Sequence, residues 1–341
     1  MMRSMPVQHT RAAVLPAARG AVRIAPVEIR DPGPGEVLLK MEACGVCHSD
    51  LFVAGLEKLP LTPLTLGHEG IGRVEAVGDG VWQFAPGDRA GMTFLGSTCG
   101  SCDWCRAGLE RFCPRQLNFG YTLNGALAGW AVAPASHLAR IPAGLNAAEA
   151  APLCCAGWTA FGALREAGLE AGQTVALFGY GGLGHLALQM ARGRGLRAAV
   201  ADVSEEKLEM ARAAGADIAV AADNAGRTLQ KQQGGADAAI VFTANAAAIQ
   251  QAFRALKRTG TLVLVGLATT AYELPLVDTV LKGVTVRGSY LGTARDLEEV
   301  FALACAGVVR ARVEPHELEE APALLERLRR GLILGRAVIS F

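Results

Sequence analysis

The sequence predicts an α/β protein with a barrel-like β domain followed by a doubly wound domain that contains a six-stranded parallel sheet. Short runs of Val, Leu and Ile broken by Gly and Pro dominate the region before residue 150. From residue 155 onward, wholly apolar runs alternate with Ala-rich amphipathic segments, a pattern typical of parallel strands covered on both faces. The length of 341 residues fits about two domains.

The first domain is expected to contain short strands joined by tight turns. Apolar runs at residues 27–29, 36–40 and 71–77 predict strands, and the Gly-Pro clusters at 31–35 and 86–88 predict turns. The six strands of the second domain are expected at residues 175–178, 198–201, 218–220, 239–242, 261–265 and 284–286. The end of the chain returns to mixed strand and helix. We therefore expect one domain at 1–155 and 293–341 and the other at 156–292.

Composition limits the classes of function. Hydrophobic residues make up 51% and charged residues 19%, as in a compact globular enzyme, and the net charge of +1 gives no electrostatic case for binding nucleic acid or a membrane. The longest uncharged apolar run, residues 150–164, falls short of the ~20 residues that span a bilayer. The N-terminal region has no continuous apolar segment, so no signal peptide is expected. These features predict a cytoplasmic protein.

Four of the nine cysteines form a tight cluster. An odd number of cysteines without an export signal argues against a disulfide framework. The spacing Cys-x2-Cys-x2-Cys-x7-Cys predicts a closed, tetrahedral structural zinc site in a lobe at about residues 95–115, with Cys99, Cys102, Cys105 and Cys113 as ligands. Buried free cysteines are a weaker explanation of this spacing. A nucleic-acid-binding ribbon is disfavoured because two arginines in the lobe are balanced by two acids.

A second group of potential ligands lies between Cys44 and Glu69. The segment Cys44-Gly-Val-Cys47-His48-Ser49-Asp50 is followed by Gly67-His68-Glu69, which resembles half of a metal site. A catalytic zinc usually takes three protein ligands and leaves a fourth position open. Cys44, Cys47, Cys154 and Cys155 are all candidates for the thiol ligands, and the residues alone do not select among them.

A glycine-rich turn follows the first apolar run of the second domain. Gly179, Gly181 and Gly184 form a GxGxxG pattern before an expected helix, where a dinucleotide pyrophosphate meets the helix N-terminus. Asp202 ends the next strand, where an acid would hold the adenosine ribose hydroxyls, which favours NAD over NADP. Asp202 could also cap the following helix, and Arg197 leaves NADP open.

Five motifs in this order resemble the zinc-dependent medium-chain alcohol dehydrogenases over nearly the whole chain. They are Cys44-Gly-Val-Cys47-His-Ser-Asp-Leu51, Gly67-His-Glu-x2-Gly72-x5-Gly78-x2-Val81, the four-cysteine lobe, Cys155-Ala-Gly-Trp-Thr159 and Gly179-x-Gly-Gly-Leu-Gly184. The resemblance implies a GroES-like β-barrel domain, a Rossmann domain, two zinc ions per chain, NAD, and a homodimer or homotetramer paired through residues 274–286. It also implies reversible oxidation of a primary or secondary alcohol to an aldehyde or ketone.

The resemblance also assigns roles to individual residues. It implies that Cys47, His68 and Cys155 bind the catalytic zinc, as in the Cys2His site for which alcohol dehydrogenase is a standard example, because the family's ligand immediately precedes Ala-Gly. Asp50 would orient the imidazole of His68, and Ser49 would take the alcohol proton. Cys44 and Cys154 would then be packing residues.

Residues around the cofactor follow from the same resemblance. It implies that the nucleotide contacts Gly179, Gly181, Gly182, Leu183, Gly184, Asp202, His48, Thr159, Arg336 and Gly266. Arg336 could also pair with Glu69 behind the metal. Phe52 stands where many relatives carry a His that passes the proton to solvent. The substrate pocket is expected near Thr93, Leu95, Phe119, Tyr121 and Trp158.

The resemblance has several alternatives. A zinc-free reductase of the same superfamily would lack the ligand set, and a non-catalytic zinc protein would show a lost ligand or a filled fourth position. Cinnamyl-type, polyol and formaldehyde dehydrogenases are compatible with the same motifs.

Overall fold

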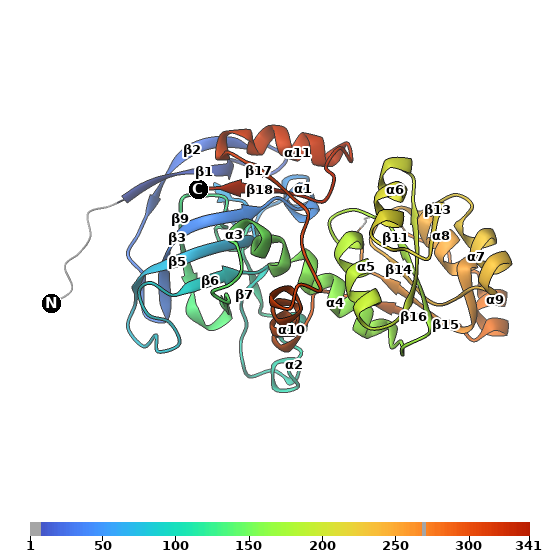
Figure 1. Cartoon of the computed structure of the whole chain (residues 1–341). Helices are drawn as coiled ribbons and strands as arrows, with labels where there is room; N and C mark the ends of the chain where they lie inside the picture. Colours follow the sequence, from blue (N-terminus) through green and yellow to red (C-terminus); the bar gives the residue numbers. More distant parts are fainter. Residues whose placement is uncertain (1–7, 268–270) are drawn as a thin grey trace. The chain divides into compact units, whose positions relative to one another are not determined.

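The computed structural model describes residues 8–267 and 271–341, and the chain divides into two compact units (Figure 1). The first unit comprises residues 1–155 and 311–341, and the second comprises residues 156–310. Residues 293–310, expected in the first domain, belong to the second unit. The reason is that α10 (Ala294–Cys305) packs on α4 (Ala156–Ala167), and Arg165 of α4 forms an ion pair with Asp296 of α10.

The main sheet of the first unit has seven strands in the order β10-β6-β5-β3-β18-β17, with β9 also paired to β3. Its long central strand β3 is buried over most of its length, as the apolar run predicts. The strands are β3 (Glu36–Gly45), β5 (Glu69–Val77), β6 (Arg89–Met92), β9 (Trp130–Pro134), β10 (Ala139–Arg140), β17 (Val313–His316) and β18 (Arg336–Ser340). Thus the end of the chain, β18, is a strand of the first unit and lies antiparallel to the end of β3.

Smaller elements complete the first unit. One sheet has the order β2-β1-β4, with β1 (Gln8–Leu15), β2 (Arg23–Ile29) and β4 (Leu64–Thr65), and another pairs β7 (Leu95–Ser97) with β8 (Leu117–Asn118). The helices are α1 (His48–Ala54), α2 (Asp103–Arg106), α3 (Ala147–Ala150) and α11 (Ala321–Arg329). Short 3-10 turns lie at η1 (Glu110–Phe112), η2 (Ala135–His137), η3 (Ala151–Cys154) and η4 (Leu318–Glu320). One apolar core joins the strands to α11.

The second unit is a doubly wound sheet of six parallel strands in the order β13-β12-β11-β14-β15-β16. The strands are β11 (Thr174–Phe178), β12 (Arg197–Asp202), β13 (Ile218–Ala221), β14 (Ala236–Val241), β15 (Leu256–Leu264) and β16 (Thr285–Gly288). Each of the six predicted apolar runs overlaps one of these strands, so the parallel sheet is confirmed. The strand order reverses beside β11, where the chain crosses from β13 to β14.

Helices cover both sides of this sheet (Figure 1). On one side lie α4, α5 (Gly184–Gly193) and α6 (Glu205–Ala213), and on the other lie α7 (Ala225–Gln233) and α8 (Ala246–Ala255). The remaining helix, α9 (Leu276–Lys282), precedes β16. Because both faces are covered, β11 is buried at every position. Among the described residues, no helix has both the length and the hydropathy needed to cross a bilayer.

Candidate metal centres and cofactor site

Four buried side chains converge in the first unit. One ligand atom from each of Cys47, His68, Glu69 and Cys155 lies within 4.8 Å of the others. Cys47 precedes α1 as its N-cap, and Cys155 follows η3. Glu69 is the first residue of β5, and His68 immediately precedes it. The fold therefore brings Cys155, which is distant in sequence, next to the thiol of Cys47 and the imidazole of His68. Of the two adjacent thiols that the residues left open, this cluster contains Cys155 and not Cys154.

Asp50 connects the two segments that carry the ligands. Its Oδ2 accepts a hydrogen bond from the backbone N–H of Cys47 at 2.9 Å, and its Oδ1 accepts one from Gly67 at 3.1 Å. The same Oδ1 lies 3.5 Å from Nδ1 of His68. Gly67 has a φ of +96°, and a Cβ there would meet the backbone N of Leu127 at 2.7 Å, so only glycine fits.

The geometry of the cluster fits a zinc ion. The Sγ atoms of Cys47 and Cys155 are 3.9 Å apart, and two sulfurs on one tetrahedral zinc lie about 3.8 Å apart. Nε2 of His68 is buried and has no hydrogen-bond partner among the described residues, which is costly for a polar atom unless something pairs with it. Thiols and an imidazole are the ligands that zinc prefers.

The electrostatics of the cluster follow from burial and close contact. The hydrogen bond with Cys155 lowers the pKa of the Cys47 thiol well below its ordinary value, although burial opposes this. The same hydrogen bond, together with burial, raises the pKa of Cys155. Burial also opposes a charge on His68, but the carboxylate of Asp50 and the thiolate of Cys47 raise its pKa to about 10. In the absence of metal, these shifts favour a thiolate at Cys47, a thiol at Cys155 and an imidazolium at His68.

Glu69 forms a buried ion pair with Arg336. Arg336 comes from β18, and its Nη2 donates to Oε1 of Glu69, with both residues at most 3% exposed. The second oxygen, Oε2, has no hydrogen-bond partner among the described residues. A Cβ at Gly45 would overlap the Glu69 carboxylate, so a glycine there leaves room for this pair. The pairing is one of the two roles that the resemblance implies for Arg336, and contact with the pyrophosphate remains a prediction.

Other residues of the first unit take simpler positions. Cys44 and Cys154 are fully buried, and burial raises the pKa of both thiols, that of Cys154 to about 12. Ser49 Oγ lies 3.8 Å from Sγ of Cys47. Phe94, which no sequence motif had marked, packs edge-on against His68 with ring centroids 5.2 Å apart. An aromatic residue just after a strand is too common to mark such a contact in advance.

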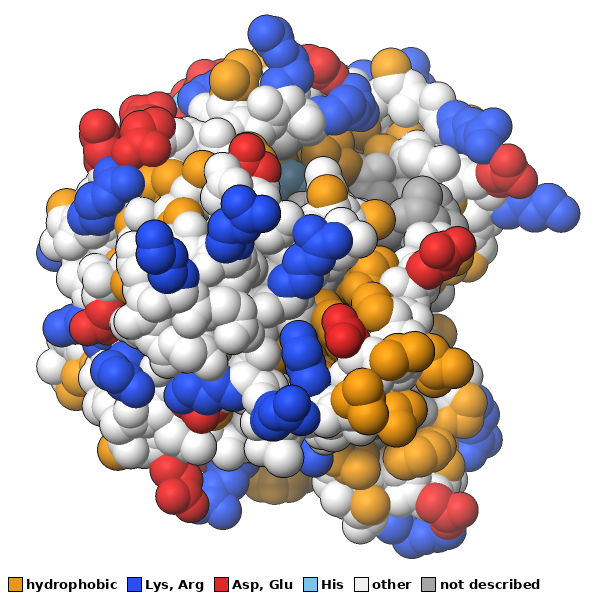
Figure 2. All heavy atoms as spheres, turned by 90° about the vertical axis from the view of Figure 1, so that its right-hand side faces the viewer, with side chains coloured by type: hydrophobic (Ala, Val, Ile, Leu, Met, Phe, Trp, Pro, Cys, Tyr) orange, Lys and Arg blue, Asp and Glu red, His pale blue; other side chains and the backbone are white. Residues whose placement is uncertain are grey.

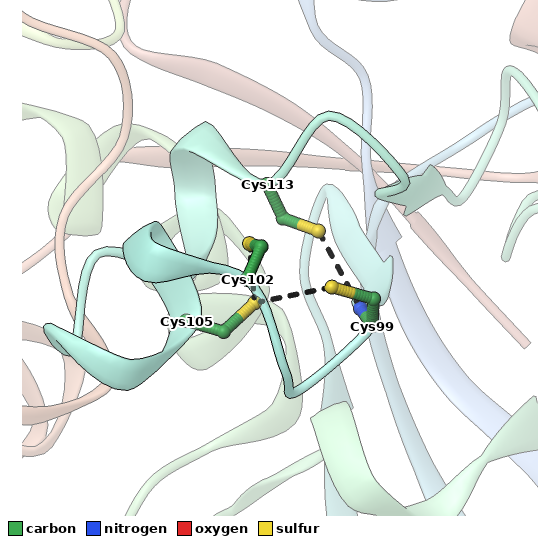
Figure 3. Close-up of side chains that lie close together, drawn as sticks. All are labelled: Cys99, Cys102, Cys105 and Cys113. Carbon is green, nitrogen blue, oxygen red and sulfur yellow. Dashed lines mark hydrogen bonds between the residues drawn. The ribbon is translucent and has the colours of Figure 1, made fainter.

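The four lobe cysteines also converge. Figure 3 shows their side chains directed toward one another, from the N-cap and first turn of α2, the end of η1 and the loop before α2. The Sγ atoms of Cys99 and Cys105 are 3.9 Å apart, and those of Cys102 and Cys105 are 3.5 Å apart. A disulfide would need about 2.05 Å.

The lobe therefore fits a closed zinc site. All four Sγ atoms lie within 4.8 Å of one another, close to the spacing of sulfurs on a tetrahedral zinc. The backbone N–H of Ser101 lowers the pKa of Cys99 to about 5, which favours the thiolate that binds metal. The backbone N–H of Cys99 also donates to Sγ of Cys113 at 3.4 Å. The predicted cluster is thus assembled by short-range turns.

The glycine-rich turn in the second unit has the geometry of a phosphate cradle. Gly179 has a φ of +98°, and a Cβ at Gly184 would overlap the carbonyl oxygen of Gly179, so both positions require glycine. A Cβ at Gly181 would meet no atom within 4 Å, which leaves open space beside the backbone. The turn leads into α5, whose N-terminus carries partial positive charge. The residues fit a dinucleotide.

Asp202 is the last residue of β12 and is 7% exposed. Its Oδ2 accepts from the backbone N–H of Tyr180 at 2.6 Å, and its Oδ1 accepts from Ser204 at 3.0 Å. The N-cap of α6 is Ser204, which accepts from the N–H of Lys207, so Asp202 is not the helix cap. Its carboxylate instead fixes the glycine-rich turn from the neighbouring strand.

The other predicted cofactor residues are distributed over both units. Thr159 is buried in α4, and a Cβ at Gly266 would meet Thr243 at 2.5 Å, in the loop after β14. His48 is the exposed first residue of α1 in the first unit. Trp158, expected near the substrate pocket, donates its indole N–H to the carbonyl of Thr293 within the second unit.

Comparisons with known proteins agree with this geometry. The family model described as "Alcohol dehydrogenase GroES-like domain" matches residues 33–143, and the model described as "Zinc-binding dehydrogenase" matches residues 182–306. An alcohol dehydrogenase of Geobacillus stearothermophilus is 44% identical over 337 residues, covering 97% of this chain and 98% of its own.

Two solved structures are similar over almost the whole chain. An alcohol dehydrogenase of Aeropyrum pernix has a TM-score of 0.91 at 32% identity, covering 97% of this chain and 100% of its own. An acetophenone reductase of Geotrichum candidum, solved in complex with NAD, has a TM-score of 0.89 at 29% identity, covering 99% of each chain. The chain is therefore an oxidoreductase that belongs to the zinc-dependent medium-chain alcohol dehydrogenase family.

Proposed function

We propose that this enzyme uses NAD and two zinc ions per chain to interconvert small primary or secondary alcohols with aldehydes or ketones. The observation that carries the proposal is the convergence of Cys47, His68 and Cys155 around a buried imidazole nitrogen that lacks a partner. The first unit supplies these ligands and the second supplies the glycine-rich turn. The remaining member of the cluster, Glu69, is paired with Arg336. Cys47, His68 and Cys155 are therefore the proposed ligands, and the fourth position is left for substrate, as a catalytic site requires.

The residues of the first unit have separable roles in this proposal. A bound zinc would supply a Lewis acid that lowers the pKa of a hydroxyl group. Asp50 holds His68 by its Nδ1, so that Nε2 is the nitrogen directed at the metal. Ser49 takes the proton of the alcohol at its Oγ. Arg336 pairs with the carboxylate of Glu69 in a buried site, which limits the excess of negative charge around the ligands.

NAD is the proposed cofactor because Asp202 would repel a 2′-phosphate. NAD would accept hydride from the carbinol carbon. Arg197, which left NADP open, is the first residue of β12, whereas Asp202 is the last. Five strand steps separate them by about 16 Å, which is beyond the reach of an arginine side chain. This separation supports a preference for NAD over NADP.

Zinc content and cofactor use measured together test the proposal. We expect two zinc ions per chain, with NADH formed faster than NADPH across a panel of primary, secondary and aromatic alcohols. Cys47→Ser should remove one zinc and the activity while the lobe zinc remains. If the protein held a single zinc that survives Cys47→Ser and disappears in Cys102→Ser, the catalytic-metal proposal would fail.

We also propose that the chain forms a homodimer, or a homotetramer built from such dimers, through α9 and β16. β16 ends the parallel sheet, so one of its edges is unpaired within the described chain. Hydrophobic side chains gather on the face in Figure 2, and the exposed ones on these two elements are Leu276, Val277, Val280, Leu281 and Val286. An apolar surface beside a free strand edge favours association with an identical chain.

Light scattering tests this assembly. Val280→Glu places a charge in the apolar surface and should shift the molar mass toward that of the monomer. Val308→Glu, at an exposed valine outside the surface, is the matched control and should leave the mass unchanged. A wild-type chain that is monomeric at micromolar concentration would contradict the proposal.

We propose that the enzyme works in the cytoplasm. All nine cysteines are unpaired thiols, which suits a reducing compartment. Recovery of the activity in an exported fraction would contradict this.

A further inference from the structure

The segment after β16 carries a polar group that lacks a partner. Ser289 follows β16 at the carboxyl edge of the sheet, the edge at which a doubly wound fold binds its ligand, and β14, β15 and β16 form the second nucleotide-binding half. Its side chain is buried, and Oγ has no hydrogen-bond partner among the described residues. A buried hydroxyl without a partner is unfavourable, so this hydroxyl is available to a ligand bound at the carboxyl edge.

Leu291 in the same segment has an unusual backbone conformation. Its φ is +55°, in the left-handed region, and the residue is only 6% exposed. A bulky residue rarely adopts this conformation, which persists only where surrounding structure holds it. The segment must therefore be fixed by its neighbours.

Helix α4 supplies that constraint through direct contact with the backbone of the segment. Nε1 of Trp158 donates to the carbonyl oxygen of Thr293 at 2.7 Å. A Cβ on Gly292 would meet Nε1 of the indole at 2.5 Å, and a Cβ on Gly162 would overlap the carbonyl oxygen of Leu291. Both glycines thus permit an approach of helix and segment that any side chain would prevent.

A second contact anchors the far end of the segment. Nη1 of Arg165, one helical turn from Gly162, contacts both carboxylate oxygens of Asp296 at 2.7 and 2.5 Å. Oδ2 of Asp296 accepts from the backbone N–H of Thr293, and Oγ1 of Thr293 accepts from the N–H of Asp296. These reciprocal hydrogen bonds form the capping box at the start of α10. The segment is therefore held at two points of α4, namely Trp158 and Arg165.

We propose that Trp158 is a positioning residue that holds the backbone of residues 289–292 in the conformation that binds the nicotinamide half of the cofactor. The inference rests on the proposed use of NAD. Trp158 does not itself touch the cofactor. It acts through the carbonyl of Thr293 and the left-handed turn at Leu291. The Ser289 hydroxyl then makes a direct polar contact with the cofactor.

Trp158→Phe removes the indole N–H and keeps an aromatic ring. We expect NADH to bind about tenfold more weakly to the zinc-loaded variant in isothermal titration, the loss typical of one buried hydrogen bond. The KM for NAD should rise in parallel, whereas the KM for the alcohol stays within twofold. Backbone amides of residues 289–296 should exchange hydrogen faster in the absence of cofactor. Trp82→Phe, at a tryptophan that is 88% exposed, is the matched control and should change none of these.

Gly162→Ala tests the same contact if the tryptophan variant folds poorly. Alanine normally stabilises a helix interior relative to glycine, but here the added methyl displaces the Leu291 carbonyl. We expect weaker NADH binding and faster exchange at residues 289–296, with α4 itself still protected. Gly144→Ala is the control, because a methyl group there meets no atom within 4 Å.

The outcomes separate this inference from the proposed function. NADH binding within twofold of wild type in both Trp158→Phe and Gly162→Ala would overturn the positioning role while leaving the NAD assignment intact. An equal loss in the Trp82→Phe control would also overturn it. A wild-type protein that binds neither NADH nor NADPH would refute both the positioning role and the proposed cofactor.

Discussion

Zinc binding at Cys47, His68 and Cys155 is expected to release about two protons per ion at pH 7. In the metal-free site the pKa of Cys47 lies well below its ordinary value, which favours the thiolate. The pKa of Cys155 is raised, which favours the protonated thiol. The pKa of His68 is raised to about 10, which favours the imidazolium at pH 7. Zinc needs two thiolates and a neutral imidazole, which expels both protons.

Calorimetry counts these protons. The catalytic zinc is removed with a chelator under conditions that leave one zinc per chain, and zinc is then titrated back in two buffers of different ionisation enthalpy. Asp50→Asn should lower the count toward one, because burial lowers the pKa of His68 and only the Cys47 thiolate then opposes this effect. Asp79→Asn, at an exposed acid, is the control and should keep two. A wild-type count near one, or an equal count in Asp50→Asn, would contradict an imidazolium held by Asp50.

The same protonation gives the metal-free protein a pH-dependent stability. The pKa of His68 is higher in the folded state than in the unfolded state, so its protonation stabilises the folded state. This contribution is fully present below the unfolded pKa of about 6.5 and disappears as the pH rises through the folded pKa of about 10. The difference in unfolding free energy between wild type and Asp50→Asn should therefore shrink from pH 6 to pH 10. Urea denaturation of the chelated proteins measures this difference, and a gap that widens with pH would contradict the sign.

Three further predictions concern single residues. Phe52→His places a proton carrier at a half-exposed position of α1 and should speed alcohol oxidation at low pH; an unchanged pH–rate profile would reject this. Cys102→Ser should lose the lobe zinc and keep the catalytic zinc. Elemental analysis checks this, with the Cys47→Ser variant as the comparison. Iodoacetamide should label the exposed Cys305 of the zinc-loaded enzyme first. Cys154 is buried and has a pKa of about 12, so it should react only after unfolding. Early modification of Cys154, detected by mass spectrometry, would contradict its buried position.

Features encoded by local pattern were predictable from the sequence. The six apolar runs indicated strands of a sheet covered on both faces, because short continuous apolar runs that alternate with amphipathic helical segments are typical of parallel strands, as at 175–178. The lobe was predictable because its four thiols are separated by turns of two to seven residues, so the chain has little freedom to separate them. The glycine-rich turn was predictable from its place between a strand and a helix.

Features that depend on distant contacts were not predictable from pattern alone. Cys154 and Cys155 are adjacent thiols, and only the resemblance preferred the second, which the fold then brings to Cys47. Phe94 has no signature that foretells an edge-on contact with His68. The boundary at 293 assumed that the amphipathic segment 294–305 returns to the first domain. Its apolar face suits any helix partner equally well, and in the structure that partner is α4.

The carboxylate of Asp50 has a consequence for how the enzyme matures. Because it accepts backbone hydrogen bonds from both the Cys47 and the Gly67 segments, the protein itself connects the two segments that carry the ligands. We therefore expect the near-ultraviolet circular dichroism of the protein to survive removal of the catalytic zinc. Activity should then return when zinc is added back, without synthesis of new chains.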